Sequence, residues 1–223
     1  MNNENDYQFY EHGIGGPVLL YLSAPEETGG GKALFEELSA AAEGEFLLVV
    51  LPVRSWDRFL TPWPAEGGMG KRSFTGEGRA LLSRILSEIL PALSEQYPQH
   101  KEIYLAGYSL AGLFALWALY ESEAFAGAAS ASGSLWYPGW TAYGTGEKWR
   151  NGRAARVYLS LGDREHRSRN PFMRKVQEAT EMQYRYFCEQ ENVTAVFRQE
   201  QGGHFEAVRE RTLRACLWLL KGK

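Results

Sequence analysis

Ser109 stands in the segment GYSLAG at residues 107–112, between an apolar run at residues 103–106 and a helical pattern at residues 110–120. A serine nucleophile at a sharp strand-to-helix turn needs small residues two positions before and after it, because larger side chains collide there. Gly107 and Ala111 meet this need. We predict that Ser109 is a nucleophile, although serine also favours simple helix caps. The N–H of Leu110, at the positive end of the helix, would help to hold an oxyanion.

A hydroxyl nucleophile needs a general base, and a histidine late in the chain is expected for this type of turn. Two histidines, His166 and His204, follow Ser109. His204 lies in QGGHF at residues 201–205, between the last strand pattern and the last helical pattern. The two glycines allow this loop to reach across the edge of the sheet. We therefore predict that His204 is the base, the alternative being a surface or helix-capping residue.

The base in turn needs a carboxylate that orients it. The segment GDREHR at residues 162–167 follows a strand pattern at residues 157–161 and offers two carboxylates, Asp163 and Glu165. Glu165 has the spacing from the strand that is usual for this loop, and Asp163 lies closer to the strand and could turn back into the same space. The sequence favours Glu165 and leaves Asp163 open.

A second oxyanion donor is expected in the loop after the strand pattern at residues 18–23, which places it at Ser23 or Ala24. Substrate contacts are expected in the loops that follow the carboxyl ends of the strands. Two of these loops are rich in aromatic residues, which suits a bulky, ring-containing or planar group. The alternative is that these side chains cover a satellite core. The predicted substrate-binding residues are Trp56, Asp57, Trp63 and Trp136.

Strand and helix patterns alternate along the chain, which predicts an α/β protein with a mostly parallel central sheet and helices on both faces. A long irregular loop is expected at residues 54–77, and Pro91 is expected to kink or interrupt a helix. One domain over residues 1–223 fits the length. The expected strands are 18–23, 46–51, 103–106, 125–130, 157–161 and 193–197; the expected helices are 33–42, 81–90, 110–120, 171–190 and 206–221.

The bulk composition narrows the class of partner. The net charge is −3, with lysine and arginine scattered along the chain, which argues against nucleic acid or an anionic membrane as the main partner. Cys188 and Cys216 form no disulfide or zinc pattern and are expected to be ordinary thiols. The polar N-terminal residues 1–13 show no signal-peptide pattern, and no apolar stretch is long enough to span a bilayer, so a cytoplasmic protein is expected.

These motifs resemble the "Putative esterase" family of α/β-hydrolases, which includes enterochelin-type ferric-siderophore esterases and esterase D. The resemblance covers most of the chain and rests on GYSLAG, on LGDRE at residues 161–165 and on GGHF at residues 202–205. It implies an α/β-hydrolase fold and hydrolysis of carboxylic esters through an acyl-enzyme, without a metal or other cofactor. Ala111 stands where glycine is commoner.

The sequence therefore predicts a serine hydrolase that acts on a small-molecule ester, with a bulky, aromatic or siderophore-like group as one option. An acyltransferase or a thioesterase would use the same three residues, so these readings stay open. A binding protein that has kept the fold without activity is a further alternative. Such proteins usually lose a member of the triad, whereas here a serine, an acid and a histidine occur in the expected order.

Overall fold

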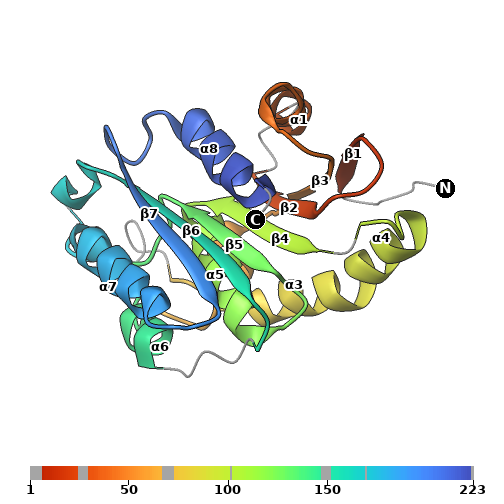
Figure 1. The fold of residues 1–223 in the computed structure, drawn as a ribbon. Helices are drawn as coiled ribbons and strands as arrows, with labels where there is room; N and C mark the ends of the chain where they lie inside the picture. The colour runs from red at the N-terminus through yellow and green to blue at the C-terminus, as the bar shows by residue number, and fades with distance from the viewer. Residues whose placement is uncertain are drawn as a thin grey trace.

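The computed structural model describes residues 7–24, 30–66, 73–100, 102–146, 152–168 and 170–221. Seven strands form one sheet in the order β1-β3-β2-β4-β5-β6-β7 (Figure 1). Strands β2 to β7 run parallel, and β1 pairs antiparallel with β3 at the edge. The strands are β1 Gln8–His12, β2 Val18–Ser23, β3 Phe46–Pro52, β4 Ile103–Tyr108, β5 Gly127–Ala131, β6 Ala155–Gly162 and β7 Val193–Glu200.

Helices cover both faces of this sheet, as the alternating patterns predicted (Figure 1). Helices α1 and α8 pack together on one face, and α3, α5, α6 and α7 lie on the other. Helix α5 follows β4 at once and is buried on nearly every side, which its apolar sequence predicts. The main helices are α1 Gly30–Ala41, α3 Gly78–Arg84, α4 Leu90–Gln96, α5 Leu110–Glu121, α6 Trp140–Gly146, α7 Val176–Cys188 and α8 Val208–Leu220.

Pro91 is accommodated without a break in the chain of helical turns. A π-helical turn, Ile85–Ile89, separates α3 from α4, and Pro91 stands at the start of α4. Proline has no N–H to donate within a helix, and a wider π turn relieves the clash with the preceding carbonyls. The expected disturbance is therefore present as a local change of helix type.

Several sequence expectations needed correction at element ends. The edge strand β1 was not predicted, because its half-exposed sequence lacks a strong apolar pattern. Helix α1 begins at Gly30, three residues before the expected start at residue 33. The long loop at residues 54–77 contains a short helix, α2 Trp56–Phe59, and a bridge between Ala65 and Phe74. Residues 67–72 of that loop lie outside the described residues.

The two cysteines are free thiols, as expected. Cys188 is exposed, whereas Cys216 is buried on α8 in the core between that helix and the sheet. Burial raises the pKa of the Cys216 thiol to about 12. Both cysteines are thus separate from the carboxyl ends of β4 to β7, where the candidate site lies.

Candidate active site

Ser109 occupies a strained turn between β4 and α5. Its backbone has φ 57° and ψ −121°, a region that residues with a side chain rarely enter. The close approach of strand and helix explains why Gly107 is needed, because a Cβ at Gly107 would lie 2.6 Å from the Cβ of Ala111. Ser109 stands at the N-cap position of α5, but its hydroxyl makes no capping hydrogen bond to the helix.

Main-chain hydrogen bonds from neighbouring segments hold this turn. The Ser109 N–H donates to the carbonyl of Ala131 at 3.1 Å, and the Ser109 carbonyl accepts from the N–H groups of Leu113 at 3.1 Å and Ser134 at 3.0 Å. The Ser134 hydroxyl also lies 3.2 Å from the Ser109 hydroxyl. The end of β5 therefore fixes the nucleophile candidate from one side, and the strain at Ser109 is offset by these bonds.

His204 connects Ser109 to a carboxylate in one continuous line. Its Nε2 lies 3.0 Å from the Ser109 Oγ, and its Nδ1 lies 2.7 Å from Oε2 of Glu165. Ser109 follows β4, Glu165 follows β6 and His204 follows β7, so the three residues meet at the carboxyl ends of these strands. In the sequence, 95 positions separate Ser109 from His204. This geometry suits proton transfer between a hydroxyl and an imidazole that a carboxylate orients.

Glu165 is buried and held in its ionised form. Its Oε1 accepts hydrogen bonds from the Gly162 N–H at 2.7 Å and from Arg211 Nη1 at 3.0 Å. Burial alone would raise the pKa of Glu165, but the contacts with His204, Gly162 and Ser132 outweigh it and lower the pKa below its usual range. A carboxylate of this kind stays charged at neutral pH and can stabilise a protonated imidazole.

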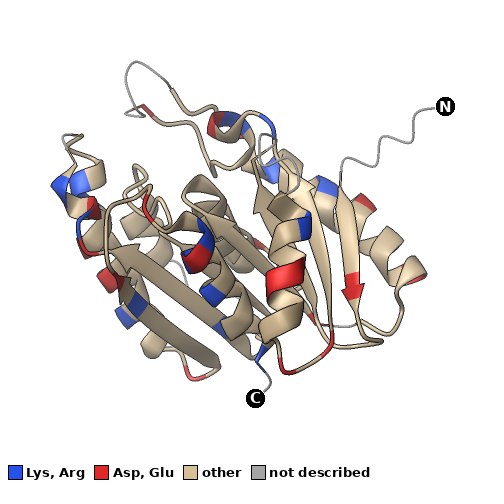
Figure 2. Cartoon of the chain, turned by 90° about the horizontal axis from the view of Figure 1, so that it is seen from above, with Lys and Arg blue, Asp and Glu red and all other residues tan. Residues whose placement is uncertain are grey.

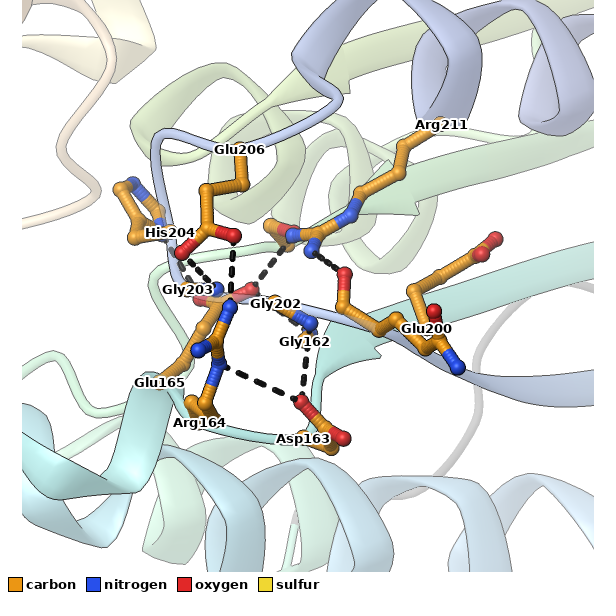
Figure 3. Close-up of polar contacts among 12 residues, drawn as sticks. Gly162, Asp163, Arg164, Glu165, Glu200, Gly202, Gly203, His204, Glu206 and Arg211 are labelled. Carbon is orange, nitrogen blue, oxygen red and sulfur yellow. Dashed lines mark hydrogen bonds and ion pairs between the residues drawn. The ribbon is translucent and has the colours of Figure 1, made fainter.

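Asp163, the other carboxylate left open by the sequence, does not contact the His204 ring but holds the loop of that residue (Figure 3). Its Oδ1 accepts from the Gly202 N–H at 2.8 Å and lies 4.0 Å from Arg164 Nε. Arg164 also donates to Glu206 at 2.6 Å, and Glu206 accepts from the Gly203 N–H at 3.0 Å.

A cavity of about 430 Å³ opens beside Ser109 and His204, a volume typical of small-molecule sites. Trp56, Asp57 and Trp136, three of the residues proposed from the sequence as substrate contacts, line it. A larger cavity of about 580 Å³ lies beside β3, and the described residues that line it do not include Ser109, His204 or Glu165. The other described residues that line the cavity are Phe74, Tyr108, Leu110, Ser134, Met173, Phe205 and Val208.

Trp63 requires a correction, since it is not among the described residues that line this cavity. Its indole packs against Tyr137 and Tyr143, with ring centroids 5.8 Å and 5.2 Å away, and its Nε1 donates to the Pro138 carbonyl at 2.9 Å. Trp63 thus packs against the main hydrophobic core on this face of the sheet, which is closer to the covering role that the sequence left open.

The two expected oxyanion donors lie beside the Ser109 turn. Leu110 begins α5, so its N–H falls in the first helical turn, where no carbonyl of the helix can accept it. Leu22 pairs with Gly107 across the sheet, and Ser23 and Ala24 follow at the end of β2. The Ser23 carbonyl accepts from the Val53 N–H at 2.9 Å.

A model of the family described as "Putative esterase" matches residues 1–212. The chain belongs to this esterase family. Family membership makes it a carboxylic ester hydrolase, and a small-molecule ester is the substrate that this class implies. A search of curated proteins found no match to the chain.

Solved structures share the fold of the esterase at low sequence identity. The siderophore hydrolase EstA from Aspergillus nidulans is 15% identical, with a TM-score of 0.69 over 98% of this chain and 95% of that one. An IroE-like serine hydrolase from Shewanella oneidensis is 14% identical, with a TM-score of 0.78 over 96% and 75%. The enterobactin esterase FES from Shigella flexneri is 18% identical, with a TM-score of 0.68 over 96% and 54%. These likenesses confirm the α/β-hydrolase fold.

The surface of the esterase carries charges of both signs. In Figure 2 basic and acidic residues both occur on several helices and loops. Within the part of the chain that the structure describes, no helix combines the length and hydropathy needed to cross a membrane.

Sequence reasoning missed Arg211, which contacts Glu165, and Ser134, which contacts Ser109. Arg211 could have been noticed from its position in the last helix. Arg211, Ala215 and Leu219 are spaced four residues apart on the buried face of that helix, where an arginine is unusual. Ser134 gave no such signal, because a serine after a strand is ordinary.

Proposed function

We propose that the esterase cleaves carboxylic esters by a serine mechanism with an acyl-enzyme intermediate. Ser109 attacks the ester carbonyl carbon while His204 Nε2 takes the hydroxyl proton. Collapse of the tetrahedral intermediate breaks the bond to the alcohol, which leaves with the proton from His204. Water then attacks the acyl group on Ser109 and loses a proton to His204. As the bond from the acyl carbon to Ser109 Oγ breaks, His204 returns this proton to Oγ and the carboxylic acid is released.

The observation that carries this proposal is the hydrogen-bonded line from Ser109 through His204 to Glu165, with contacts of 3.0 Å and 2.7 Å. A serine that only capped a helix would not need a strained backbone or an imidazole at this distance. The ionised Glu165 supports the role, because it stabilises the imidazolium that forms when Ser109 gives up its proton.

The negative oxygen of the tetrahedral intermediate would be held by main-chain N–H groups. The first is that of Leu110, which the start of α5 leaves without a partner inside the helix. The second comes from Ser23 or Ala24, at the end of the strand next to β4. Two donors fixed in this way act on the transition state without reorganisation.

The cavity favours an ester with an apolar or aromatic group. Trp56, Phe74, Trp136 and Met173 give it a largely apolar wall, and Phe205, which is 76% exposed, stands at its rim. A flat ring gains both buried area and ring contacts against such a wall. Siderophore-type esters, which some structural neighbours hydrolyse by name, belong to the same test panel.

The test is hydrolysis of p-nitrophenyl esters together with labelling by a fluorophosphonate reagent. We expect turnover and labelling in the wild type, and a drop in kcat of about 10³-fold or more with no labelling in Ser109→Ala. Aryl and branched acyl esters are expected to give higher kcat/KM than acetate esters. Added alcohols that divert the acyl group to a new ester would reassign the enzyme to acyl transfer.

Ser87→Ala is the matched control, because Ser87 is an exposed helical serine whose hydroxyl bonds only to the Ser83 carbonyl among the contacts described. It should label and turn over like the wild type. Equal labelling of Ser109→Ala and wild type would sink the nucleophile assignment. Absence of turnover with every ester tested, in folded and unlabelled protein, would sink the serine mechanism.

A further inference from the structure

Arg211 is a fully buried arginine at the back of the proposed triad. It is the fourth residue of α8, its exposed fraction is 0%, and its side chain reaches from the helix toward the turn that carries Glu165 (Figure 3). Burying a guanidinium costs several kcal/mol unless charge and hydrogen bonds compensate it. The position of this side chain therefore calls for a compensating set of partners.

The partners come from four different segments of the esterase. Nη1 of Arg211 lies 3.0 Å from Oε1 of Glu165, 3.0 Å from the Ser132 hydroxyl and 3.2 Å from the Tyr108 hydroxyl. Nη2 donates to the Gln201 carbonyl at 2.7 Å. One guanidinium thus joins the last residue of β4 to the segments that follow β5, β6 and β7.

These contacts fix both the acid and the base. With Oε1 of Glu165 held by Arg211 and Gly162, the other oxygen, Oε2, points at the His204 ring. The Tyr108 hydroxyl, which accepts from Arg211, donates in turn to the His204 carbonyl at 2.6 Å. Arg211 is therefore connected to His204 in two ways. Glu165 links it to the imidazole ring, and Tyr108 links it to the main-chain carbonyl.

Gly162 supports the same arrangement from the strand side. A Cβ at this position would lie 2.8 Å from Nη2 of Arg211 and 2.3 Å from the Gly202 carbonyl oxygen. A glycine thus stands where the guanidinium and the His204 loop pass the end of β6. A side chain at residue 162 would therefore collide with the guanidinium and with the His204 loop.

We propose that Arg211 is a positioning residue that holds Glu165 against His204 and balances the charge of that pair. The inference rests on the proposed function, because it assigns Arg211 to the same triad. It goes further because it assigns to a buried cation, Arg211, control over the pH at which the Glu165–His204 pair takes up a proton.

The direction of this effect follows from charge. Without a proton, the Glu165–His204 pair carries one negative charge, which Arg211 offsets; with one proton, the pair is neutral. Removing the cation makes the unprotonated form less stable, so the pair would keep its proton to higher pH. The other ionisable groups around the pair are Tyr108 on β4, Asp57 on α2, Asp163, Arg164 and His166 in the turn after β6, and Glu206 before α8.

The experiment compares Arg211→Met and Arg211→Lys with Arg214→Met. Arg214 lies three residues further on the same helix and makes a two-pronged ion pair with Glu200, at 2.9 Å and 2.7 Å, away from the triad. The readouts are the NMR titration of the His204 ring and the low-field signal of its Nδ1 proton. The chain has four histidines, so His204→Gln assigns the signal. Neither readout needs turnover.

We expect Arg211→Met to raise the midpoint of the pair's titration by about one pH unit or more. Lysine keeps the charge but cannot serve four acceptors, so Arg211→Lys should stay near the wild-type midpoint while the Nδ1 proton signal shifts or broadens. Arg214→Met should match the wild type in both readouts. In the active enzyme, the acid limb of kcat/KM should move with the titration midpoint.

A wild-type titration and Nδ1 signal in folded Arg211→Met would overturn the proposal. If that variant does not fold, Arg211→Lys decides, and an unchanged Nδ1 signal there has the same meaning. Shifts equal in size in Arg214→Met would reduce Arg211 to a general packing role, which also overturns it. Failure of the serine mechanism would be distinguishable from this. In that case the wild type would not be labelled by the fluorophosphonate, but the His204 titration would still shift in Arg211→Met.

Discussion

Glu165 and Asp163 lie two residues apart in one turn, and both bind the loop that carries His204, but they bind different parts of it. Glu165 is buried and contacts the imidazole ring at 2.7 Å. Asp163 has a half-exposed side chain and contacts the main chain at Gly202. The same functional group thus contacts the imidazole ring in one case and the backbone of the loop in the other.

The difference shows that one carboxylate of this turn orients the imidazole ring, whereas the other holds the backbone of the same loop. Contact with the ring puts Glu165 in a position to choose the imidazole tautomer and to stabilise its protonated form. Contact with a backbone N–H lets Asp163 fix the loop without taking part in the proposed proton transfer. Burial strengthens the contact between Glu165 and the His204 ring, because water screens it little. The hydrogen bond from the Gly202 N–H to Asp163 does not need burial to hold the loop.

The largest expected effect comes from removing the two charges in turn. Glu165→Gln should lower kcat/KM by roughly 10³- to 10⁴-fold, because an amide N–H facing His204 Nδ1 favours the wrong tautomer. Asp163→Asn should lower it only a few-fold, because the amide oxygen can still accept from Gly202. Ester hydrolysis under kcat/KM conditions, with thermal melts of both variants, measures the contrast.

Equal losses in the two variants would break the comparison and make Asp163 a second member of the proton-transfer line. A Glu165→Gln enzyme within ten-fold of the wild type would instead leave His204 oriented by its main-chain contacts alone. Either result would be read only in variants whose melting curves remain cooperative.

A smaller effect is expected on stability, and it depends on pH. The pKa of Glu165 is lowered in the folded protein, so its carboxylate stabilises the fold fully above its ordinary pKa, and this stabilisation is lost as pH falls through the folded value. Glu165→Gln should therefore lower the free energy of unfolding by about 3 kcal/mol near pH 7, where it strands a buried arginine. Below about pH 4 the gap should narrow.

Urea unfolding of the wild type and Glu165→Gln at several pH values measures this gap, with Asp163→Asn as the reference for losing a carboxylate from the same turn. A gap that stays constant down to acid pH would mean that the charge of Glu165 does not contribute to folding. The pairing with Arg211 would then be a matter of shape alone.

The sequence predicted the parts of this site that depend on local pattern and chain order. The apolar strands, the small residues Gly107 and Ala111, and the helix after Ser109 are local features, so the strand-turn-helix at Ser109 could be read directly. His204 followed from its place between the last strand and the last helix. The family itself was identified from the same segments.

Other parts depend on contacts that only the folded chain creates. Both Asp163 and Glu165 can reach the His204 loop, so spacing favoured one without separating them. Arg211 contacts Glu165 from 46 positions away, and the amphipathic pattern of α8 did not predict which residue it would contact. Trp63 looked like a pocket residue because aromatic loops can either line pockets or cover a hydrophobic core.

The smallest expected effect lies in the outer layer of the loop, where Arg164 pairs with Glu206 at 2.6 Å. Both side chains are about half exposed, at 50% and 58%, so water and salt screen the pair. A double-mutant cycle with Arg164→Ala and Glu206→Ala should give a coupling of about 0.5 kcal/mol that weakens in salt. The change in kcat/KM should stay below about two-fold. A coupling above about 2 kcal/mol, or a clear loss of activity, would mean that the exposed contacts around Asp163 share in placing His204, and the division between the two carboxylates would no longer hold.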